Sequence, residues 1–422
     1  MPKPRQTRST VTAGSGKSTR PGQSRTVRVP KHDGAEDFHR HTGWRSLLNP
    51  LWCYHGFRVA VLVLTCFGVI MVFSSSSVDM VSQGASPWRQ ALSQGVYCVI
   101  GLALALLTMH MPCCLYRKLG PAAIGVAMLL QALTLTPLGI TQYGNTGWIG
   151  IEGVFTLQPA EVMKLALCIW MPSALIVARK RSKERGALAY LGPGLVYLAC
   201  LALVMLGKDM GTGMIIVAIG VVAFLIGGFP LKWMALGVGV IGAAAAAFVI
   251  LSPNRLNRVL AAYTACSGTN TQGVCYQSIH ARYAIASGGL LGVGIGNSRE
   301  KWNYLPAAHN DFIFAIICEE TGFIGGALVI LLFVVIGWCL LAMALQSRNR
   351  YASMVLVCVA CWLVGQGLVN IAVVVGLLPV MGVPMPFVSA GGSSLIMCLG
   401  AAGVAASMMR DNPQVGAERV TV

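Results

Sequence analysis

Residues 207–213, with the sequence GKDMGTG, place Asp209 between two apolar runs that are each long enough to cross a lipid bilayer. The upstream run, 187–206, contains no charged residue, and neither does the downstream run, 211–228. A carboxylate near the end of a membrane helix costs free energy, and the glycines around it let the backbone turn tightly. The pattern indicates either a functional carboxylate at a membrane surface or a solvated turn that merely contains an aspartate.

The composition places this turn in a polytopic membrane protein. Of the 422 residues, 55% are hydrophobic and 11% are charged, whereas soluble domains carry about 25% charged residues. A helix needs about 20 mostly apolar residues to cross the hydrocarbon core. We therefore expect an all-α protein with about ten transmembrane helices. The expected spans are 57–73, 91–109, 119–138, 157–178, 187–206, 211–228, 234–251, 321–345, 351–375 and 394–409.

The distribution of Lys and Arg predicts the orientation. If the ten spans alternate, 23 of the 31 Lys and Arg residues fall on one side, eleven of them within residues 1–58. The positive-inside rule then places both termini in the cytoplasm. We attribute the net charge of +17 to this topology and to attraction for anionic lipid. Nucleic-acid binding is not expected, because the basic tail lacks interleaved aromatic residues.

The spans divide the chain into three parts. Residues 1–49 are rich in Ser, Thr, Arg, Pro and Gly, so we expect a disordered, basic cytoplasmic tail. Residues 50–410 form the transmembrane domain, and residues 411–422 form a second cytoplasmic tail. The longest outer loop, 252–311, joins the seventh and eighth helices.

This outer loop is basic on the side of the membrane where positive charge is usually scarce. Its basic residues are Arg255, Arg258, Arg282, Arg299 and Lys301. They are either tolerated in a solvated loop or form a surface that meets the phosphate or pyrophosphate of a lipid headgroup. We favour the second interpretation, because irregular backbone at membrane level persists where it lines a cavity.

Two cysteines, Cys266 and Cys275, lie in the same loop among Ser, Gly, Thr and Asn. If this compartment is oxidising, we expect a disulfide between them. Zinc binding is the alternative, but no nearby pair of His or Cys residues completes a tetrahedral set.

Glu161 and Lys164 open the fourth span and are three residues apart, so they share one face of a helix. Opposite charges inside a membrane segment are expected to pair and to face the protein interior. The pair would lock this helix to a neighbour, tune the charge of another acid, or help to hold a transient metal ion. Spacing alone leaves these alternatives open.

Two segments rich in glycine interrupt the apolar pattern near the outer face. Residues 288–298 alternate glycine with apolar residues, which favours close backbone packing or a phosphate-facing loop over a nucleotide site. Residues 379–394 contain three prolines and three glycines. A continuous helix is therefore excluded there, and we expect the segment to bend or re-enter at the outer surface.

Five motifs occur in order along the chain. They are QPxExxK at 158–164, DxGT at 209–212, HxDFIFA at 309–315, EExG at 319–322 and PFVSxGGSS at 386–394. Together they resemble the SEDS family (shape, elongation, division and sporulation proteins), and the resemblance covers residues 57–410. The sequence GNS at 296–298, Lys301 and the motif at 309–315 are more similar to division members of that family than to elongation members.

The resemblance implies a peptidoglycan glycosyltransferase that polymerises lipid II at the outer face of the bacterial cytoplasmic membrane, at the division septum. It implies that Asp209 is the essential catalytic carboxylate and that Glu161 and Lys164 support it. The residues expected to bind substrate are Lys208, Arg282, Lys301, His309, Asp311, Ser389, Gly391, Gly392 and Ser393. The expected partners are lipid II, membrane lipid, a class B penicillin-binding protein transpeptidase and other division proteins. The candidate cofactor is a divalent cation, Mg²⁺ or Mn²⁺, and the sequence does not indicate which residues would bind it.

Four residues depart from the family pattern: Lys208 stands where the family has Pro, Gly147 where it has Arg, Ala307 where it has Glu, and Ala390 where it has Tyr. These departures bear on substrate binding more than on the catalytic acid. A lipid II flippase would use the same acids as a polar pathway, and a scaffold for division proteins is a third hypothesis. We favour the enzyme because the polar features crowd the outer face, and because a scaffold leaves the cost of the buried charges unexplained.

Overall fold

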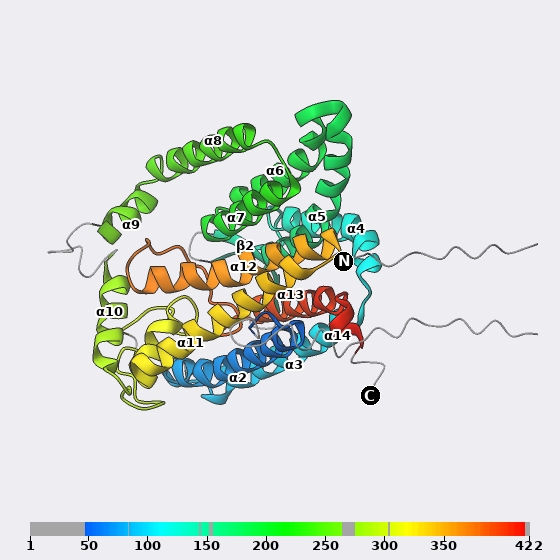
Figure 1. Ribbon diagram of the computed structural model, residues 1–422. Coiled ribbons are helices and arrows are strands. Elements are labelled where there is room, and N and C mark those ends of the chain that lie inside the picture. The colour runs from blue at the N-terminus through cyan, green and yellow to red at the C-terminus, as the bar shows by residue number, and fades with distance from the viewer. Residues whose placement is uncertain are drawn as a thin grey trace, which may run out of the picture.

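The computed structural model describes residues 47–417 except 83, 143–144, 152–154, 264–274 and 303. Most of this part of the chain is helical (Figure 1). The helices are α2 (Pro50–Ser82), α3 (Trp88–His110), α4 (Cys113–Leu133), α5 (Pro159–Arg185), the 3-10 helix η2 (Gly186–Tyr190), α6 (Leu191–Leu206), α7 (Met210–Gly227), α8 (Leu231–Ile250), α9 (Pro253–Tyr263), α10 (Tyr276–Gly288), α11 (Ile313–Gln346), α12 (Arg350–Val374), α13 (Gly392–Arg410) and α14 (Pro413–Ala417). The strands are β1 (Gly139–Gln142), β2 (Asn145–Ile151) and β3 (Phe155–Leu157).

The predicted polytopic fold is confirmed. Within the described residues, nine helical stretches are long and apolar enough to cross a membrane. One of them, Pro159–Leu206, has 48 residues, which is more than twice the length of about 20 that one crossing needs. It turns at Gly186, whose φ is 57°, between α5 and α6. Counted as two helices, this stretch brings the number of crossings to the expected ten.

Several helices extend beyond the predicted spans. Helix α2 continues to Ser82 instead of ending at 73, and α5 continues to Arg185 instead of 178. Helix α11 begins at Ile313 instead of 321, because a helical segment precedes a kink at Gly322 (φ 69°, ψ −167°). Hydropathy locates where a chain leaves the hydrocarbon, whereas backbone hydrogen bonds let a helix continue past that point.

The predicted loops contain regular structure that hydropathy did not reveal. A three-stranded antiparallel sheet in the order β1-β2-β3 connects α4 to α5, with Ile140 opposite Trp148 and Ile149 opposite Leu157. The outer loop 252–311 contains α9 and α10. These elements are too short to produce a long periodic pattern. We call the end of the bundle where this sheet lies and where α7 begins the sheet end.

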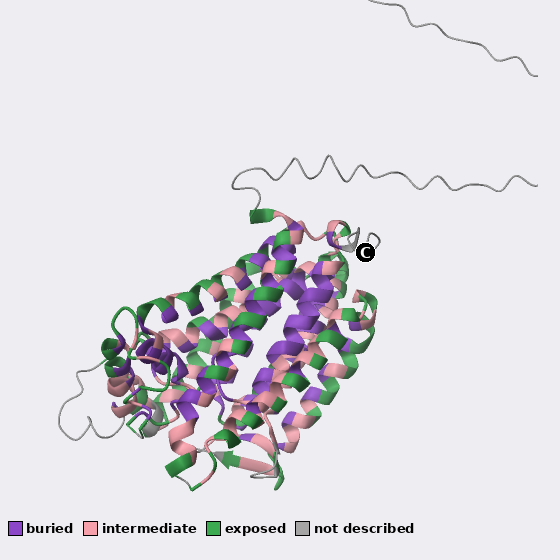
Figure 2. Ribbon diagram, turned by 90° about the horizontal axis from the view of Figure 1, so that it is seen from below, coloured by how far each residue is buried: buried purple, intermediate pink, exposed green. Residues whose placement is uncertain are grey.

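Burial is uneven across the bundle. Figure 2 shows buried residues along its centre and exposed residues around its edge. Helix α13 is the most enclosed span, and a Cβ atom at its Gly403 would lie 2.4 Å from the carbonyl oxygen of Ala105, so a small residue is needed where it meets α3. Helix α8 has no buried residue and packs mainly against α7 and α9, apart from the rest of the bundle (Figure 1).

Candidate active site

Asp209 is held at the N-terminus of α7 by contacts to both carboxylate oxygens. Oδ1 accepts a hydrogen bond from the backbone N–H of Thr212 at 3.0 Å, and Oδ2 accepts one from Nε2 of Gln158 at 3.1 Å. The residue is 6% exposed. The free N–H groups of a helix N-terminus favour a negative charge at this position. The residue therefore caps α7, and its orientation is fixed by two separate elements.

Strand β2 covers one side of Asp209. The backbone N–H of Thr146 donates to the carbonyl oxygen of Gly207 at 3.0 Å, which ties the strand to the turn before α7. A Cβ atom at Gly147 would lie 3.8 Å from Oδ2 of Asp209 and 3.6 Å from Oδ1 of Asn145. Oδ1 of Asn145 is buried and has no hydrogen-bond partner among the described residues. A Cβ at Gly147 would therefore be in van der Waals contact with two oxygen acceptors, one from Asp209 and one from Asn145.

The segment 381–383 separates Asp209 from a second acid, Asp311. A Cβ atom at Gly211, two residues after Asp209, would lie 2.6 Å from a carbonyl oxygen of this segment. On its other side, a Cβ atom at Gly382 would lie 3.6 Å from Oδ2 of Asp311. Nδ2 of Asn370 donates to the backbone oxygen of Asp311 at 2.8 Å and to the backbone oxygen of Val383, in the segment, at 2.7 Å. The segment predicted to be irregular thus forms a wall shared by both acids.

Asp311 is half-buried, and burial raises the pKa of its carboxyl from 3.8 to about 6. The negative charge of Asp209 contributes to this rise, whereas His309 and Arg258 oppose it, and the pKa of about 6 is the net result. The charge of Asp209 therefore acts on the carboxyl of Asp311 across the wall.

The motif residues His309 and Ser389 join three elements near the same wall. The Ser389 hydroxyl donates to the backbone oxygen of Asn310 at 2.7 Å. The backbone N–H of Ala390 donates to the backbone oxygen of His309 at 2.9 Å. Nδ1 of His309 lies 3.3 Å from Oδ2 of Asp79, near the end of α2. These contacts hold the chain before α11 against the segment before α13.

Ser393, Gly391 and Gly392 shape the N-terminus of α13. The Ser393 hydroxyl accepts from the backbone N–H of Gln158 at 3.2 Å, and the N–H of Gly391 donates to Oε1 of Gln94 at 3.4 Å. A Cβ atom at Gly392 would lie 2.6 Å from a tyrosine ring of α3. All three predicted substrate residues therefore make structural contacts here, and their role toward substrate stays a prediction.

The predicted pairing of Glu161 with Lys164 is confirmed, with 2.8 Å between Nζ and Oε1 and both residues 1% exposed. Nζ also donates to Oε1 of Gln366 at 2.7 Å and lies 5.1 Å from the ring centroid of Trp362. Nε2 of Gln366 in turn donates to the backbone oxygen of Pro384 at 2.8 Å. The pair thus connects α5, through α12, to the chain that follows the wall of the site.

The three predicted substrate cations lie in different environments. Lys208, next to Asp209, is exposed and has a left-handed backbone conformation (φ 64°). Arg282 on α10 is exposed, and its Nε lies 3.3 Å from the Cβ position of Gly376. Lys301 is only 4% exposed, and its ammonium group is bound inside the fold. Lys208 and Arg282 can meet an anion from solvent, whereas Lys301 would first have to leave its partners.

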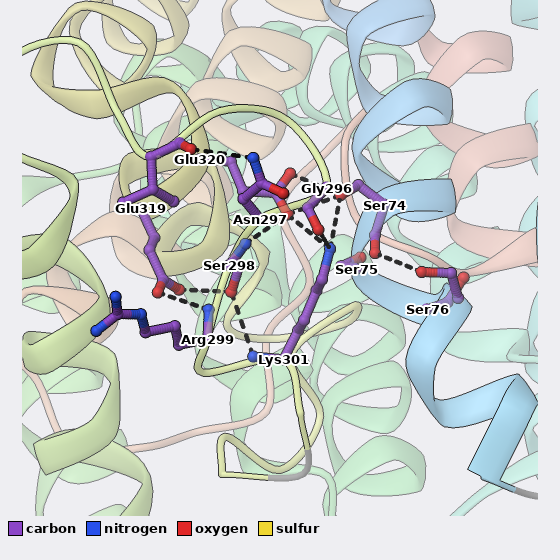
Figure 3. A network of polar contacts seen from close by, with 12 residues as sticks. Ser74, Ser75, Ser76, Gly296, Asn297, Ser298, Arg299, Lys301, Glu319 and Glu320 are labelled. Atoms are coloured by element: carbon purple, nitrogen blue, oxygen red, sulfur yellow. Dashed lines mark hydrogen bonds and ion pairs between the residues drawn. The ribbon is translucent and has the colours of Figure 1, made fainter.

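Lys301 belongs to a buried polar network that joins α2, α11 and the chain between α10 and α11 (Figure 3). Its Nζ lies 3.0 Å from Oε1 of Glu320 and donates to the carbonyl oxygen of Gly296 at 2.7 Å. The hydroxyl of Ser74 on α2 donates to the same carboxylate at 2.6 and 2.7 Å. The sequence identified Lys301 and the EExG motif as candidate functional residues. Nothing in the sequence distinguished Ser74 from the other residues of its apolar helix.

Gln158 and Asn145 are the residues near Asp209 whose roles the sequence did not predict. Gln158 stands at the start of the QPxExxK motif, so its position was available as a signal. Asn145 lies in a strand that was not predicted, and no motif included it.

Only one of the two cysteines in the predicted disulfide lies among the described residues. Cys275 is buried and disulfide-bonded, whereas Cys266 lies outside the described residues. We expect intact-mass analysis of the alkylated, unreduced protein to find Cys266 and Cys275 both protected from alkylation. Alkylation of both thiols without prior reduction would contradict the bridge.

A resident metal ion would need a cluster of ligating side chains. In the described ranges, no three His, Cys, Asp or Glu residues lie close enough together to hold one. A Mg²⁺ ion shared with substrate phosphates needs only one or two protein carboxylates. The divalent cation therefore stays a prediction.

Comparisons with known proteins give the same family as the motifs. Residues 55–414 match the FtsW/RodA/SpoVE family, described as cell cycle proteins. The stage V sporulation protein E of Bacillus subtilis is 35% identical over 356 residues, which cover 83% of this chain and 95% of that protein. A probable peptidoglycan glycosyltransferase FtsW from Halorhodospira halophila is 36% identical over 341 residues, which cover 80% and 85%.

Solved structures share the fold. The rod shape determining protein RodA of Thermus thermophilus matches with a TM-score of 0.62 and 26% identity, over 86% of this chain and 97% of that one. A chain described under structural coordination of polymerization and crosslinking by a peptidoglycan synthase complex matches with a TM-score of 0.65 and 26% identity, over 84% and 97%. With its motifs, the ten membrane crossings of its described residues and these relatives, the chain belongs to the SEDS family of FtsW, RodA and SpoVE proteins.

Proposed function

We propose that this protein is a peptidoglycan glycosyltransferase that polymerises lipid II at the outer face of the cytoplasmic membrane during cell division. The observation that carries this proposal is the carboxylate of Asp209, fixed at the end of a membrane helix by the backbone N–H of Thr212 on Oδ1 and by Gln158 on Oδ2. Relatives named probable peptidoglycan glycosyltransferase FtsW support it. The sheet end of the bundle would then face the outside, and both termini the cytoplasm.

The reaction needs a base at the acceptor hydroxyl. The donor is the growing glycan on a polyprenyl pyrophosphate, and the acceptor is the 4-hydroxyl of a lipid II sugar. Its oxygen attacks the anomeric carbon, the bond from that carbon to the pyrophosphate breaks, and the electron pair leaves with the pyrophosphate. Asp209 accepts the hydroxyl proton through Oδ2, while Oδ1 stays on the helix N-terminus.

The leaving pyrophosphate needs positive charge. Lys208, Arg282 and Arg258 are exposed at the sheet end and are the protein cations proposed to meet it. A divalent cation would supply further neutralisation, and the carboxylate of Asp209 is the kind of oxygen ligand that Mg²⁺ prefers.

The acceptor sugar also needs recognition. Oδ1 of Asn145 is a buried acceptor without a partner among the described residues, and it lies near the same Cβ position of Gly147 as Oδ2 of Asp209. An unsatisfied buried acceptor is costly, so a substrate N–H or O–H donor is expected to satisfy it.

A polymerisation assay tests the proposal. Purified protein in detergent is supplied with fluorescently labelled lipid II, and the products are separated by length on a gel. Glycan polymer is the expected product, and its absence together with lipid II transfer across vesicle membranes would favour the flippase hypothesis. The assay in detergent has no second compartment, so transport alone cannot give a positive result.

The raised pKa of Asp311 predicts a pH dependence of stability. Between pH 3.8 and about 6 the folded protein keeps this carboxyl protonated, while the unfolded chain has lost the proton. The unfolded state binds fewer protons there, so stability falls as pH rises through this window. We expect Asp311→Asn, which cannot ionise, to lack this fall when thermal unfolding is compared from pH 4 to pH 7. Parallel profiles for the two proteins would show that Asp311 titrates normally.

The partner is proposed to be a class B penicillin-binding protein transpeptidase, and a related fold occurs in a peptidoglycan synthase complex. We expect weak polymerisation by the chain alone and stronger polymerisation when the cognate transpeptidase is co-purified. The increase should persist when the active-site serine of the transpeptidase is blocked, because contact is responsible. Equal rates with and without the partner would remove this coupling.

A further inference from the structure

An open pocket of about 340 Å³ lies where α7 and α11 end and α12 begins. Its polar lining includes Ser347, Arg348, Arg350 and Ser353, and its apolar lining includes Ile226 and Leu345. No sequence motif and no part of the proposed reaction involves these residues.

The pocket is remote from the candidate active site. Helix α7 begins directly after Asp209, and Ile226 lies near its other end. At 1.5 Å per residue, the two residues are about 25 Å apart along the helix axis. Two of the spans that border the pocket, α7 and α11, end at Gly227 and Gln346, so the pocket lies at the membrane boundary opposite the sheet end.

The rim of the pocket carries a net positive charge. Arg348 and Arg350 are both exposed, and a guanidinium nitrogen of Arg350 donates to the backbone oxygen of Ile226 at 3.2 Å. The Nε atom of Arg179 lies 3.3 Å from the Cβ position of Gly228, next to the same helix end. In the part of the chain that the structure describes, none of these three arginines pairs with a carboxylate.

One nearby carboxylate, that of Asp411, forms no ion pair with the rim arginines and offsets only one of their three charges. Asp411 at the end of α13 accepts from Nδ2 of Asn349 at 2.8 Å. Oδ1 of Asn349 caps α12 by accepting from the backbone N–H of Tyr351 at 3.1 Å. The positive charge of the rim therefore comes from the arginine side chains rather than from an uncapped helix.

The apolar wall indicates what kind of anion the pocket fits. Leu345 is 87% exposed although it is the last but one residue of a membrane helix. Arginine forks match phosphate oxygens, and basic pockets at the cytoplasmic ends of membrane helices bind anionic headgroups. A free phosphate ion would gain nothing from Ile226 and Leu345, whereas a phospholipid would cover them with its glycerol and first methylene groups.

We propose that this pocket binds the headgroup of an anionic phospholipid, with Arg348 and Arg350 on the phosphate and Leu345 against the acyl chains. The site is independent of the proposed glycosyltransferase reaction, because it lies at the other end of α7 and can be measured by lipid binding alone.

Native mass spectrometry of the full chain in detergent tests the proposal. The probes are phosphatidylglycerol and phosphatidylcholine with identical acyl chains, each added in increasing amounts, and inorganic phosphate in a third arm. We expect phosphatidylglycerol to bind more tightly than phosphatidylcholine. The double variant Arg348→Ala/Arg350→Ala should weaken phosphatidylglycerol binding by about tenfold or more. Arg348→Lys/Arg350→Lys should keep part of the affinity, which separates loss of charge from loss of folding.

A matched control removes two charges elsewhere. Lys118 and Arg181 are exposed, neither lines the pocket, and Lys118→Ala/Arg181→Ala should bind phosphatidylglycerol as the wild type does. Equal binding of the two lipids, or equal loss in the control and the arginine variant, would overturn the proposal. Displacement of phosphatidylglycerol by millimolar inorganic phosphate would reassign the pocket to a free anion.

Discussion

Asp209→Asn is expected to lower glycan polymerisation by a factor of about 100 to 10,000, the usual contribution of a general base. The amide cannot take the proton of the acceptor hydroxyl. The fold should survive, because Asn caps a helix as well as Asp does and can still accept from the N–H of Thr212. Gln158 can rotate its amide to present an oxygen to the new NH₂ group, so no donor is left opposed to another donor.

Measurement of this effect requires purified wild-type and variant proteins at equal concentration, with labelled lipid II and equal thermal unfolding midpoints. Asp411→Asn is the matched control, because Asp411 is an acid at the opposite end of the bundle. It should polymerise at nearly the wild-type rate. Near-normal polymer from Asp209→Asn would remove Asp209 from the mechanism and leave it as a helix cap.

Lys164→Ala is expected to cost about 3–5 kcal/mol of stability, because it leaves the carboxylate of Glu161 buried without its cation. The same change removes the contact to Gln366 at 2.7 Å and the contact to the Trp362 ring. Because Gln366 also holds the chain at Pro384, activity should fall together with stability. Glu161→Gln keeps an oxygen that can accept from Nζ, but it leaves the buried ammonium of Lys164 without its counter-ion, so stability should fall here too.

A double-mutant cycle measures the coupling of this pair. The free energy of unfolding and the polymerisation rate are determined for Glu161→Ala, Lys164→Ala and the double variant. We expect the double variant to lose less stability than the sum of the single variants, because neither charge is then left alone. Simple additivity would show that the two side chains contribute separately.

The features that sequence predicted are those set by local rules. Long apolar runs fixed the number of crossings, and the spacing of Glu161 and Lys164 on one helical turn was enough to pair them. Asp209 stood out because an acid between two membrane spans is rare. Prolines and glycines between 379 and 394 excluded a helix, and the structure has none from 375 to 391.

The features that sequence did not predict depend on residues distant in the chain. The sequence shows that Lys301 is basic but not that Glu320 and Ser74 meet it inside the fold, so a substrate role looked as reasonable as a structural one. The sheet that covers Asp209 was missed because its strands are short and join elements by backbone contacts. Asn145 and Gly147 lie close to Asp209 because strand β2 of that sheet places them there.

The network around Lys301 also has a consequence for folding order. Ser74 and Glu320 are 246 residues apart in the chain, and Ser74 and Lys301 are 227 apart. Contacts of such high sequence separation form late, since the intervening chain must be ordered first. Because the chain is synthesised from its N-terminus, α2 is made long before Lys301 and Glu320. The hydroxyl of Ser74 therefore has neither of these partners until both have been synthesised. The network is complete only when the chain between α10 and α11 has packed against α2 and α11. Its formation therefore requires that the N-terminal and C-terminal halves of the protein are correctly assembled.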